Sequence, residues 1–165
     1  MKKNIYPSVI SINNEKITTA FIHDLLMYNC NFRLKDIEIK SINKIKKDVF
    51  HIKYQEIDNI SLSLCSRIGS SGTIGYTMTP CLIYHIDIIV NVKDSSFYIF
   101  EIEPTLKILN FIKYIKDLNI DLIDKFNIQS LLSNSNNISS FRDYMIDNFE
   151  HLAKEYHLDN PRKKY

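Results

Sequence analysis

The sequence has few of the residues that mark the common binding motifs. Of its 165 residues, three are glycine, three are cysteine, four are proline and none is tryptophan. The cysteines, Cys30, Cys65 and Cys81, form no C-x-x-C pair and are odd in number. This argues against a disulfide framework and against a structural zinc site, and it favours a reducing, cytoplasmic compartment.

Long apolar runs are also absent. No stretch approaches the roughly 18 uninterrupted apolar residues of a membrane span, and no apolar run follows the first lysines as in a secretory signal. We therefore expect a cytoplasmic protein with no membrane partner. The content of 45% hydrophobic and 24% charged residues is that of a globular chain. It suits a single domain over residues 1–165, with frayed basic ends at about 1–5 and 160–165.

The chain lacks a large excess of either charge. Its formal net charge is +2, and five basic residues lie at the two ends, Lys2, Lys3 and 162–164. The remainder of the chain is therefore slightly acidic. A nucleic-acid-binding domain usually carries its basic residues on a folded face, so this distribution argues against nucleic acid as a partner. A nucleic-acid module built on the lysine-bearing strands of residues 40–53 would require an affinity that falls steeply with salt.

Hydrophobic periodicity predicts a helix, then a run of strands, then more helices. The first helix is expected over residues 13–30, capped by Asn13 or Asn14. Alternating apolar and polar residues predict strands at 36–40, 50–54, 60–64, 84–92 and 97–103. Further helices are expected after Pro104, within 120–132, and from residue 140 to the C-terminal region. This order predicts an α+β fold: a single antiparallel sheet of about five or six strands, with the N-terminal helix and two or three C-terminal helices packed on one face and the other face open to solvent.

All three glycines lie within one stretch, residues 66–80. Gly69, Gly72 and Gly75 do not fit a phosphate-binding loop, because no lysine follows them and no helix is expected after them. We predict a hairpin tip centred on Ser71–Gly72, with a second strand over 73–78. An anion-binding loop remains an alternative, as does a tip that becomes ordered against a partner protein. On that last interpretation Gly69, Gly72, Gly75 and Tyr76 are candidate partner-binding residues.

The hairpin of residues 84–103 carries the most informative polar side chains. Pairing Val92 with Tyr98 gathers the apolar residues on one face and sets Asp87 opposite Glu103, with Glu101 and His85 nearby. Facing carboxylates repel each other, so this acidic face has four interpretations. It could bind magnesium, manganese or calcium, supply an acid–base pair, face a basic protein partner, or simply be solvated.

Known catalytic patterns do not fit these residues. A restriction-type nuclease core needs E-x-K after its first acid, whereas Glu101-Ile102-Glu103 has glutamate in place of lysine. A Cys–His dyad of Cys65 or Cys81 with His85 would draw on cysteines in apolar stretches, which favours inert packing. We therefore assign no catalytic residue, no metal and no cofactor, and lean against an enzyme.

These observations favour a non-enzymatic protein-binding protein. Ten tyrosines, a residue enriched at interfaces, add to the acidic face in support. The most specific hypothesis is a bacterial immunity protein that neutralises a cognate toxin domain by direct binding, using His85, Asp87, Glu101, Glu103 and the glycine-rich tip. The alternatives are a metal-dependent hydrolase or nuclease acting through Asp87, Glu101 and Glu103, and a secretion chaperone.

Overall fold

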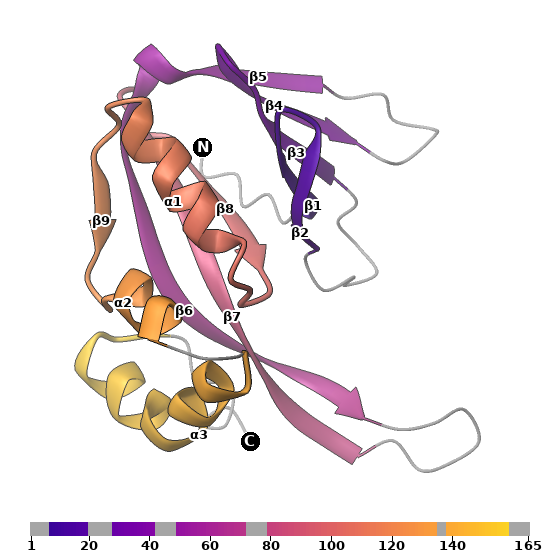
Figure 1. Cartoon of the computed structure of the whole chain (residues 1–165), viewed down its shortest axis with the longest axis vertical. Helices are drawn as coiled ribbons and strands as arrows, with labels where there is room; N and C mark the ends of the chain where they lie inside the picture. Colours follow the sequence, from indigo (N-terminus) through magenta and orange to yellow (C-terminus); the bar gives the residue numbers. More distant parts are fainter. Residues whose placement is uncertain (1–6, 20–27, 42–48, 72–78, 135–137, 159–165) are drawn as a thin grey trace.

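The fold combines two β-sheets with three α-helices. It is given by a computed structural model that describes residues 7–19, 28–41, 49–71, 79–134 and 138–158. Figure 1 shows the five-stranded sheet at one end, the long strands of the four-stranded sheet running down the molecule, and the last helix near the other end. The expected α+β class is confirmed. No helix among the described residues has the length and apolar character needed to cross a membrane.

The first sheet is mixed. Its strand order is β2-β1-β3-β4-β5, and β1 pairs in parallel with β3 whereas the other neighbours are antiparallel. The strands are β1 (Pro7–Ile12), β2 (Glu15–Thr19), β3 (Tyr28–Phe32), β4 (Asp36–Ser41) and β5 (Val49–Lys53). A single turn of 3-10 helix, η1 (Tyr54–Glu56), then leads to the second sheet.

The second sheet contains the longest strands. Its order is β8-β7-β6-β9, with β9 parallel to β6 and the other pairs antiparallel. The strands are β6 (Ile57–Ser71), β7 (Thr79–Val92), β8 (Phe97–Ile102) and β9 (Leu122–Asp124). The prediction of a single antiparallel sheet is therefore wrong. Alternating residues identify strands, but they do not say which strands become neighbours, and both parallel pairs join strands distant in sequence.

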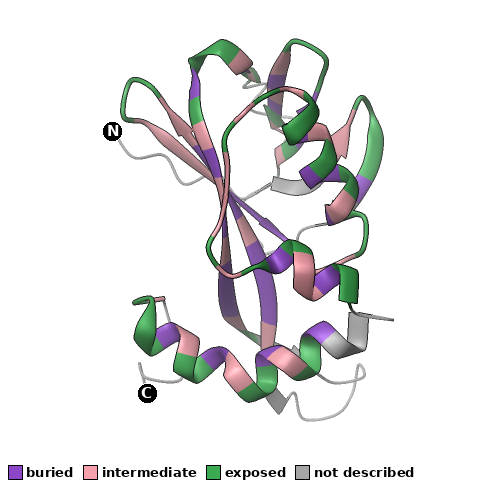
Figure 2. Ribbon diagram, turned by 60° about the vertical axis from the view of Figure 1, so that its left-hand side comes forward, coloured by how far each residue is buried: buried purple, intermediate pink, exposed green. Residues whose placement is uncertain are grey.

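The helices pack against the apolar sides of these sheets. They are α1 (Ile108–Asp117), α2 (Ile128–Asn134) and α3 (Ile138–Glu155). Figure 2 shows buried residues along the long strands and an alternation of buried and exposed residues along α3. The helices predicted after Pro104 and from residue 140 are confirmed. The predicted helix within 120–132 is partly wrong, because β9 precedes α2 in that stretch.

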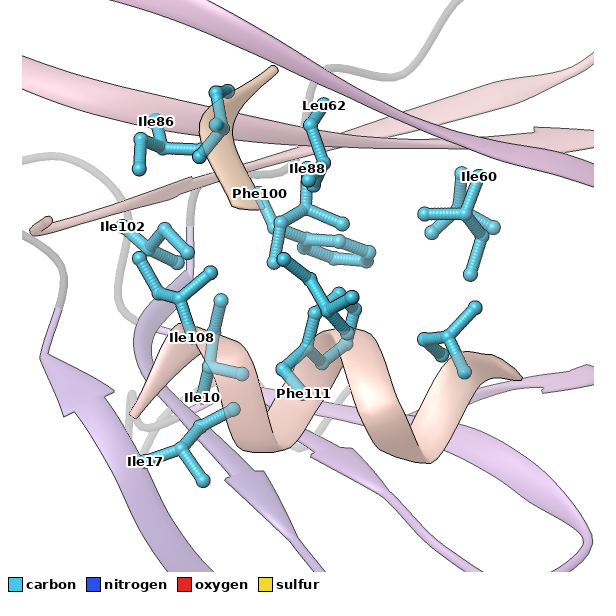
Figure 3. Close-up of a cluster of buried hydrophobic side chains, with 14 of the residues drawn as sticks. Ile10, Ile17, Ile60, Leu62, Ile86, Ile88, Phe100, Ile102, Ile108 and Phe111 are labelled. Carbon is cyan, nitrogen blue, oxygen red and sulfur yellow. The ribbon is translucent and has the colours of Figure 1, made fainter. Parts of the chain in front are cut away.

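One apolar core joins both sheets and α1. In Figure 3, Ile108 and Phe111 of α1 lie between residues of the two sheets. The Phe32 ring of β3 meets the Phe111 ring edge-on at 4.8 Å between centroids and the Phe100 ring of β8 at 6.2 Å. These rings are buried and together bring the first sheet, the second sheet and the helix into one packing unit.

The predicted N-terminal helix is wrong where the structure describes it. Asn13 and Asn14 have φ angles of 46° and 70°, the left-handed values that a two-residue hairpin turn requires. They connect β1 to β2 and so direct Glu15–Thr19 back along β1 as a strand. Asparagine favours a helix N-cap and a left-handed turn alike, which explains the error. Residues 20–27, the centre of the predicted helix, lie outside the described residues.

The predicted hairpin of β7 and β8 is confirmed, but its register is displaced by two residues. Val90, not Val92, faces Tyr98, and Asp87 faces Glu101, not Glu103. The turn decides this register. Ser95 adopts a φ of 68°, its N–H donates to the Val92 carbonyl at 2.9 Å, and the Ser96 N–H donates to Asp94 Oδ1 at 2.8 Å. A shift of two residues leaves every side chain on its original face, so the apolar pattern cannot distinguish these registers.

Candidate functional site

Five polar side chains gather on the face of the second sheet that points away from the apolar core. This polar cluster consists of Cys65, Arg67, His85, Asp87 and Glu101. Strand alternation places its members, because Ile86, Ile88 and Phe100 occupy the intervening positions and are fully buried in the core. Cross-strand pairing sets Cys65 beside His85 and Asp87 beside Glu101. Three neighbouring strands, β6, β7 and β8, thus contribute to one cluster.

The most extensive contact in the cluster is an ion pair that crosses the central strand. Arg67 of β6 donates to Glu101 of β8 through Nε at 3.0 Å and Nη2 at 2.9 Å, both to Oε2. The other carboxylate oxygen, Glu101 Oε1, lies 3.9 Å from His85 Nε2. Glu101 is only 3% exposed and His85 only 1%. The guanidinium therefore compensates a carboxylate that burial would otherwise strongly penalise.

A second contact links the thiol to the other carboxylate. Cys65 Sγ donates to Asp87 Oδ1 at 3.2 Å. Burial raises the pKa of Asp87 from 3.8 to about 6; the Cys65 hydrogen bond opposes the rise, the nearby Glu101 charge adds to it, and Arg67 opposes it. Burial, and next the Asp87 charge, raise the pKa of the Cys65 thiol well above its ordinary value. Cys65 is thus a protonated donor near neutral pH and not a poised nucleophile.

The acidic face is more enclosed than expected. His85 and Glu101 are among the most buried polar residues described, and Asp87 is partly buried, so the expectation of an open outer face is wrong for these side chains. Glu103 follows the end of β8, is partly buried, and does not oppose Asp87. The guanidinium of Arg67 compensates the charge of the enclosed Glu101 carboxylate.

The glycine-rich stretch is only partly described. Gly69 lies within β6, where its backbone pairs with Cys81. Gly72, Gly75 and Tyr76 lie outside the described residues. The turn is not centred on Ser71–Gly72, because β6 continues to Ser71, which pairs with Thr79. The connection between β6 and β7 therefore falls on residues 72–78, and the whole of the predicted strand over 73–78 lies outside the described part of the chain.

Sequence reasoning missed Arg67 and gave Cys65 no polar role. Arg67 lies two residues after Cys65, so alternation alone puts both on one face of the strand. The missing information was the pairing of β6 with β7. The observed pairing sets Cys65 opposite His85, whereas the turn that we predicted at Ser71–Gly72 does not.

Beyond the polar cluster, β6 and β7 continue as a pair. We call residues 67–71 and 79–83 the hairpin ribbon. Within the described residues, β9 pairs with β6 only at 60–62 and β8 pairs with β7 only at 86–91. The ribbon is consequently two-stranded, and Figure 1 shows its end projecting away from α3. Ile68 in this ribbon is 40% exposed.

Comparison with known proteins adds no family to this geometry. No protein-family model, no curated protein and no solved structure matches the chain.

Proposed function

We propose that this protein acts by binding another protein, and that the hairpin ribbon makes the contact by accepting an extended strand of the partner. The observation that carries the proposal is the form of the ribbon. Residues 67–71 and 79–83 pair with each other, and neither outer edge pairs with a further strand among the residues that the structure describes. Unpaired edges present alternating N–H and C=O groups, which an extended segment can satisfy.

The composition of the ribbon supports the same use. No charged residue occurs between Arg67 and Tyr84. Free strand edges are usually protected against association by charged residues, above all lysine. Apart from Arg67 at its base, the projecting ribbon is uncharged, which is more typical of a surface that another chain covers. Pro80 limits pairing at one position only, because it lacks a backbone N–H.

The side chains along the ribbon indicate what the partner segment resembles. Ile68 pairs across the ribbon with Leu82, and Arg67 pairs with Ile83; Leu82 and Ile83 are both partly buried. An added strand would lie beside these apolar side chains, so we expect a segment rich in β-branched or aromatic residues. A two-stranded ribbon has marginal stability in water, and a third strand would stabilise it.

An immunity protein that neutralises a toxin domain is the most specific form of this proposal. We now place the contact on the hairpin ribbon, however, and not on the acidic face. Glu101 is paired with Arg67 and His85 is buried, so neither is available to attract a basic partner. The toxin hypothesis now rests on strand addition, and a toxin domain with a free sheet edge is the partner that it requires.

Metal-dependent hydrolysis receives less support. Asp87 and Glu101 do face each other, as two carboxylates sharing a metal would. Yet Glu103 lies beyond the strand, and Glu101 Oε2 already accepts two hydrogen bonds from Arg67. A substrate would also have to reach carboxylates that lie beside a buried imidazole. Hydrolysis predicts a manganese-induced thermal shift that Asp87→Asn abolishes, together with cleavage of a substrate.

Site-specific photocrosslinking tests the binding proposal. A photoreactive phenylalanine replaces Ile68 in the ribbon, and a matched variant carries it at Ile146 on α3, which is 50% exposed. Both proteins are irradiated in host cell extract. We expect one discrete adduct that contains a single partner from position 68, and no such adduct from position 146. Equal adducts from both positions, or none from position 68, would contradict the proposal.

Once the partner is identified, binding affinities measured with the purified proteins distinguish a specific contact from nonspecific adhesion. Ile68→Asp is expected to weaken binding at least tenfold, because it places a charge beside the added strand. Ile146→Asp should leave the affinity unchanged. If the two substitutions have the same effect, the ribbon is not the contact.

A further inference from the structure

The polar cluster also has the form of a metal site. One thiol and two carboxylates, from Cys65, Asp87 and Glu101, offer ligand atoms that all lie within 4.8 Å of one another. The residues come from three hydrogen-bonded strands, β6, β7 and β8, so the sheet holds their backbones in place. A cysteine together with two carboxylates is a different donor set from the all-oxygen shell that magnesium and calcium require.

We propose that Cys65, Asp87 and Glu101 bind a single zinc ion that links the three strands at the base of the hairpin ribbon. Zinc takes thiolate at about 2.3 Å and carboxylate oxygen at about 2.0–2.2 Å, so these tetrahedral ligands would lie about 3.3–3.7 Å apart. Cys65 Sγ and Asp87 Oδ1 are already 3.2 Å apart. The other separations are at most 4.8 Å, about 1 Å more than this range.

The surrounding residues match the needs of such a site. Arg67 holds Glu101 through Oε2, which leaves Oε1 directed toward the imidazole of His85 at 3.9 Å. Ligating carboxylates are commonly oriented by outer hydrogen bonds of this kind. His85 is thereby placed next to the coordinating oxygen as an outer partner, because its ring nitrogens do not lie within 4.8 Å of all three ligand atoms.

Charge balance favours a divalent ion. With a thiolate at Cys65, the three ligands carry three negative charges, and zinc together with the Arg67 guanidinium carries three positive charges. The occupied cluster is therefore neutral overall, a condition that buried ionic groups require. Zinc uptake displaces the thiol proton of Cys65, which currently hydrogen-bonds to Asp87, and releases it to solvent.

The site is structural in this proposal, not catalytic. His85, Cys65 and Glu101 are all buried, so a bound ion would be enclosed by protein and not accessible to a substrate. Cys65 and His85 pair with each other on β6 and β7, just before these two strands extend beyond the sheet as the hairpin ribbon. Binding there would stiffen the base of the ribbon. The zinc proposal does not depend on the identity of any protein partner.

Cobalt substitution is the direct test, since Co²⁺ reports thiolate ligation and tetrahedral geometry by its absorption. Protein stripped with a chelator is titrated with Co²⁺ and then with Zn²⁺. We expect one equivalent of Co²⁺ to produce a thiolate-to-cobalt charge-transfer band that Zn²⁺ abolishes. Cys65→Ser and Asp87→Asn should each lose the band or weaken cobalt binding at least tenfold. Circular dichroism establishes that each variant is folded.

Cys30→Ala is the matched control, because Cys30 is a buried free thiol of the first sheet, remote from the cluster. It should retain the full band. A wild-type protein without the band overturns the proposal, as does a band that survives in Cys65→Ser. Binding of Mg²⁺ or Mn²⁺ without thiolate ligation would also overturn it, and would favour the hydrolase hypothesis instead.

Discussion

Replacing Asp87 with asparagine should stabilise the metal-free protein at pH 8 while leaving its stability at pH 4 nearly unchanged. The reason is the burial of this carboxyl, which raises its pKa from 3.8 to about 6. A group with a raised folded-state pKa binds its proton more tightly in the folded chain than in the unfolded chain. The free energy of unfolding of the wild type therefore falls as pH rises from about 4 to about 6, and stays lower above that range.

The size of this effect follows from the pKa displacement. A rise from 3.8 to about 6 corresponds to about 3 kcal/mol, at 1.36 kcal/mol for each pH unit. Asp87 keeps part of its surface exposed, so solvent screening lowers the expected difference to about 1–2 kcal/mol. Asparagine retains an Oδ1 that accepts the Cys65 thiol, which isolates the removal of charge from the loss of the hydrogen bond. Glu101, Arg67 and His85 face the same position and are present in both proteins.

Urea unfolding in the presence of a chelator, at five pH values from 4 to 8, measures the difference. The stability of Asp87→Asn relative to the wild type should grow across the interval from pH 4 to pH 6 and then level off. Asp147→Asn, on the exposed side of α3, is the control and should show no such growth in that interval. Curves for wild type and Asp87→Asn that remain parallel at every pH would refute the reasoning, as would a wild type that gains stability relative to the variant as pH rises.

Two further substitutions test the ion pair and the turn that fix the second sheet. Arg67→Met leaves Glu101 buried without its partner and should lower the free energy of unfolding by about 3 kcal/mol, with recovery when Glu101→Gln is added; urea unfolding measures both. Ser95 has a φ of 68°, so Ser95→Gly should raise the melting temperature slightly, and Ser95→Val should cost about 1 kcal/mol. Equal effects of glycine and valine would show that the left-handed φ of Ser95 does not constrain this turn.

The sequence alone predicts the strands well because their alternation is local. Residues 36–40, 50–54 and 60–64, and the hairpin that follows, all lie in or overlap observed strands. Asn13 and Asn14 show the limit of local reasoning. Asparagine suits a helix cap and a left-handed turn equally, and pairing with β1 decides between them. The parallel neighbours β1 with β3 and β6 with β9 follow from long-range packing that periodicity does not contain.

The candidate site was predictable in part. Placing His85, Asp87 and Glu101 on one face needs only the two-residue period of a strand, and this prediction is confirmed by the pairing. The ion pair of Glu101 with Arg67, which crosses from β6 to β8 over the central strand, was not predictable from that period. That contact requires the register of β6 with β7, which in turn depends on where a glycine-containing connection begins.

Hydrogen–deuterium exchange on the ribbon offers the most direct test of strand addition. The partner captured at position 68 is purified, and amide exchange is compared between the free protein and the complex. We predict slower exchange at alternate residues along one outer edge of 67–71 or 79–83, as pairing with an added strand requires. Protection confined to α3 or to the first sheet, with the ribbon unchanged, would contradict the proposed function.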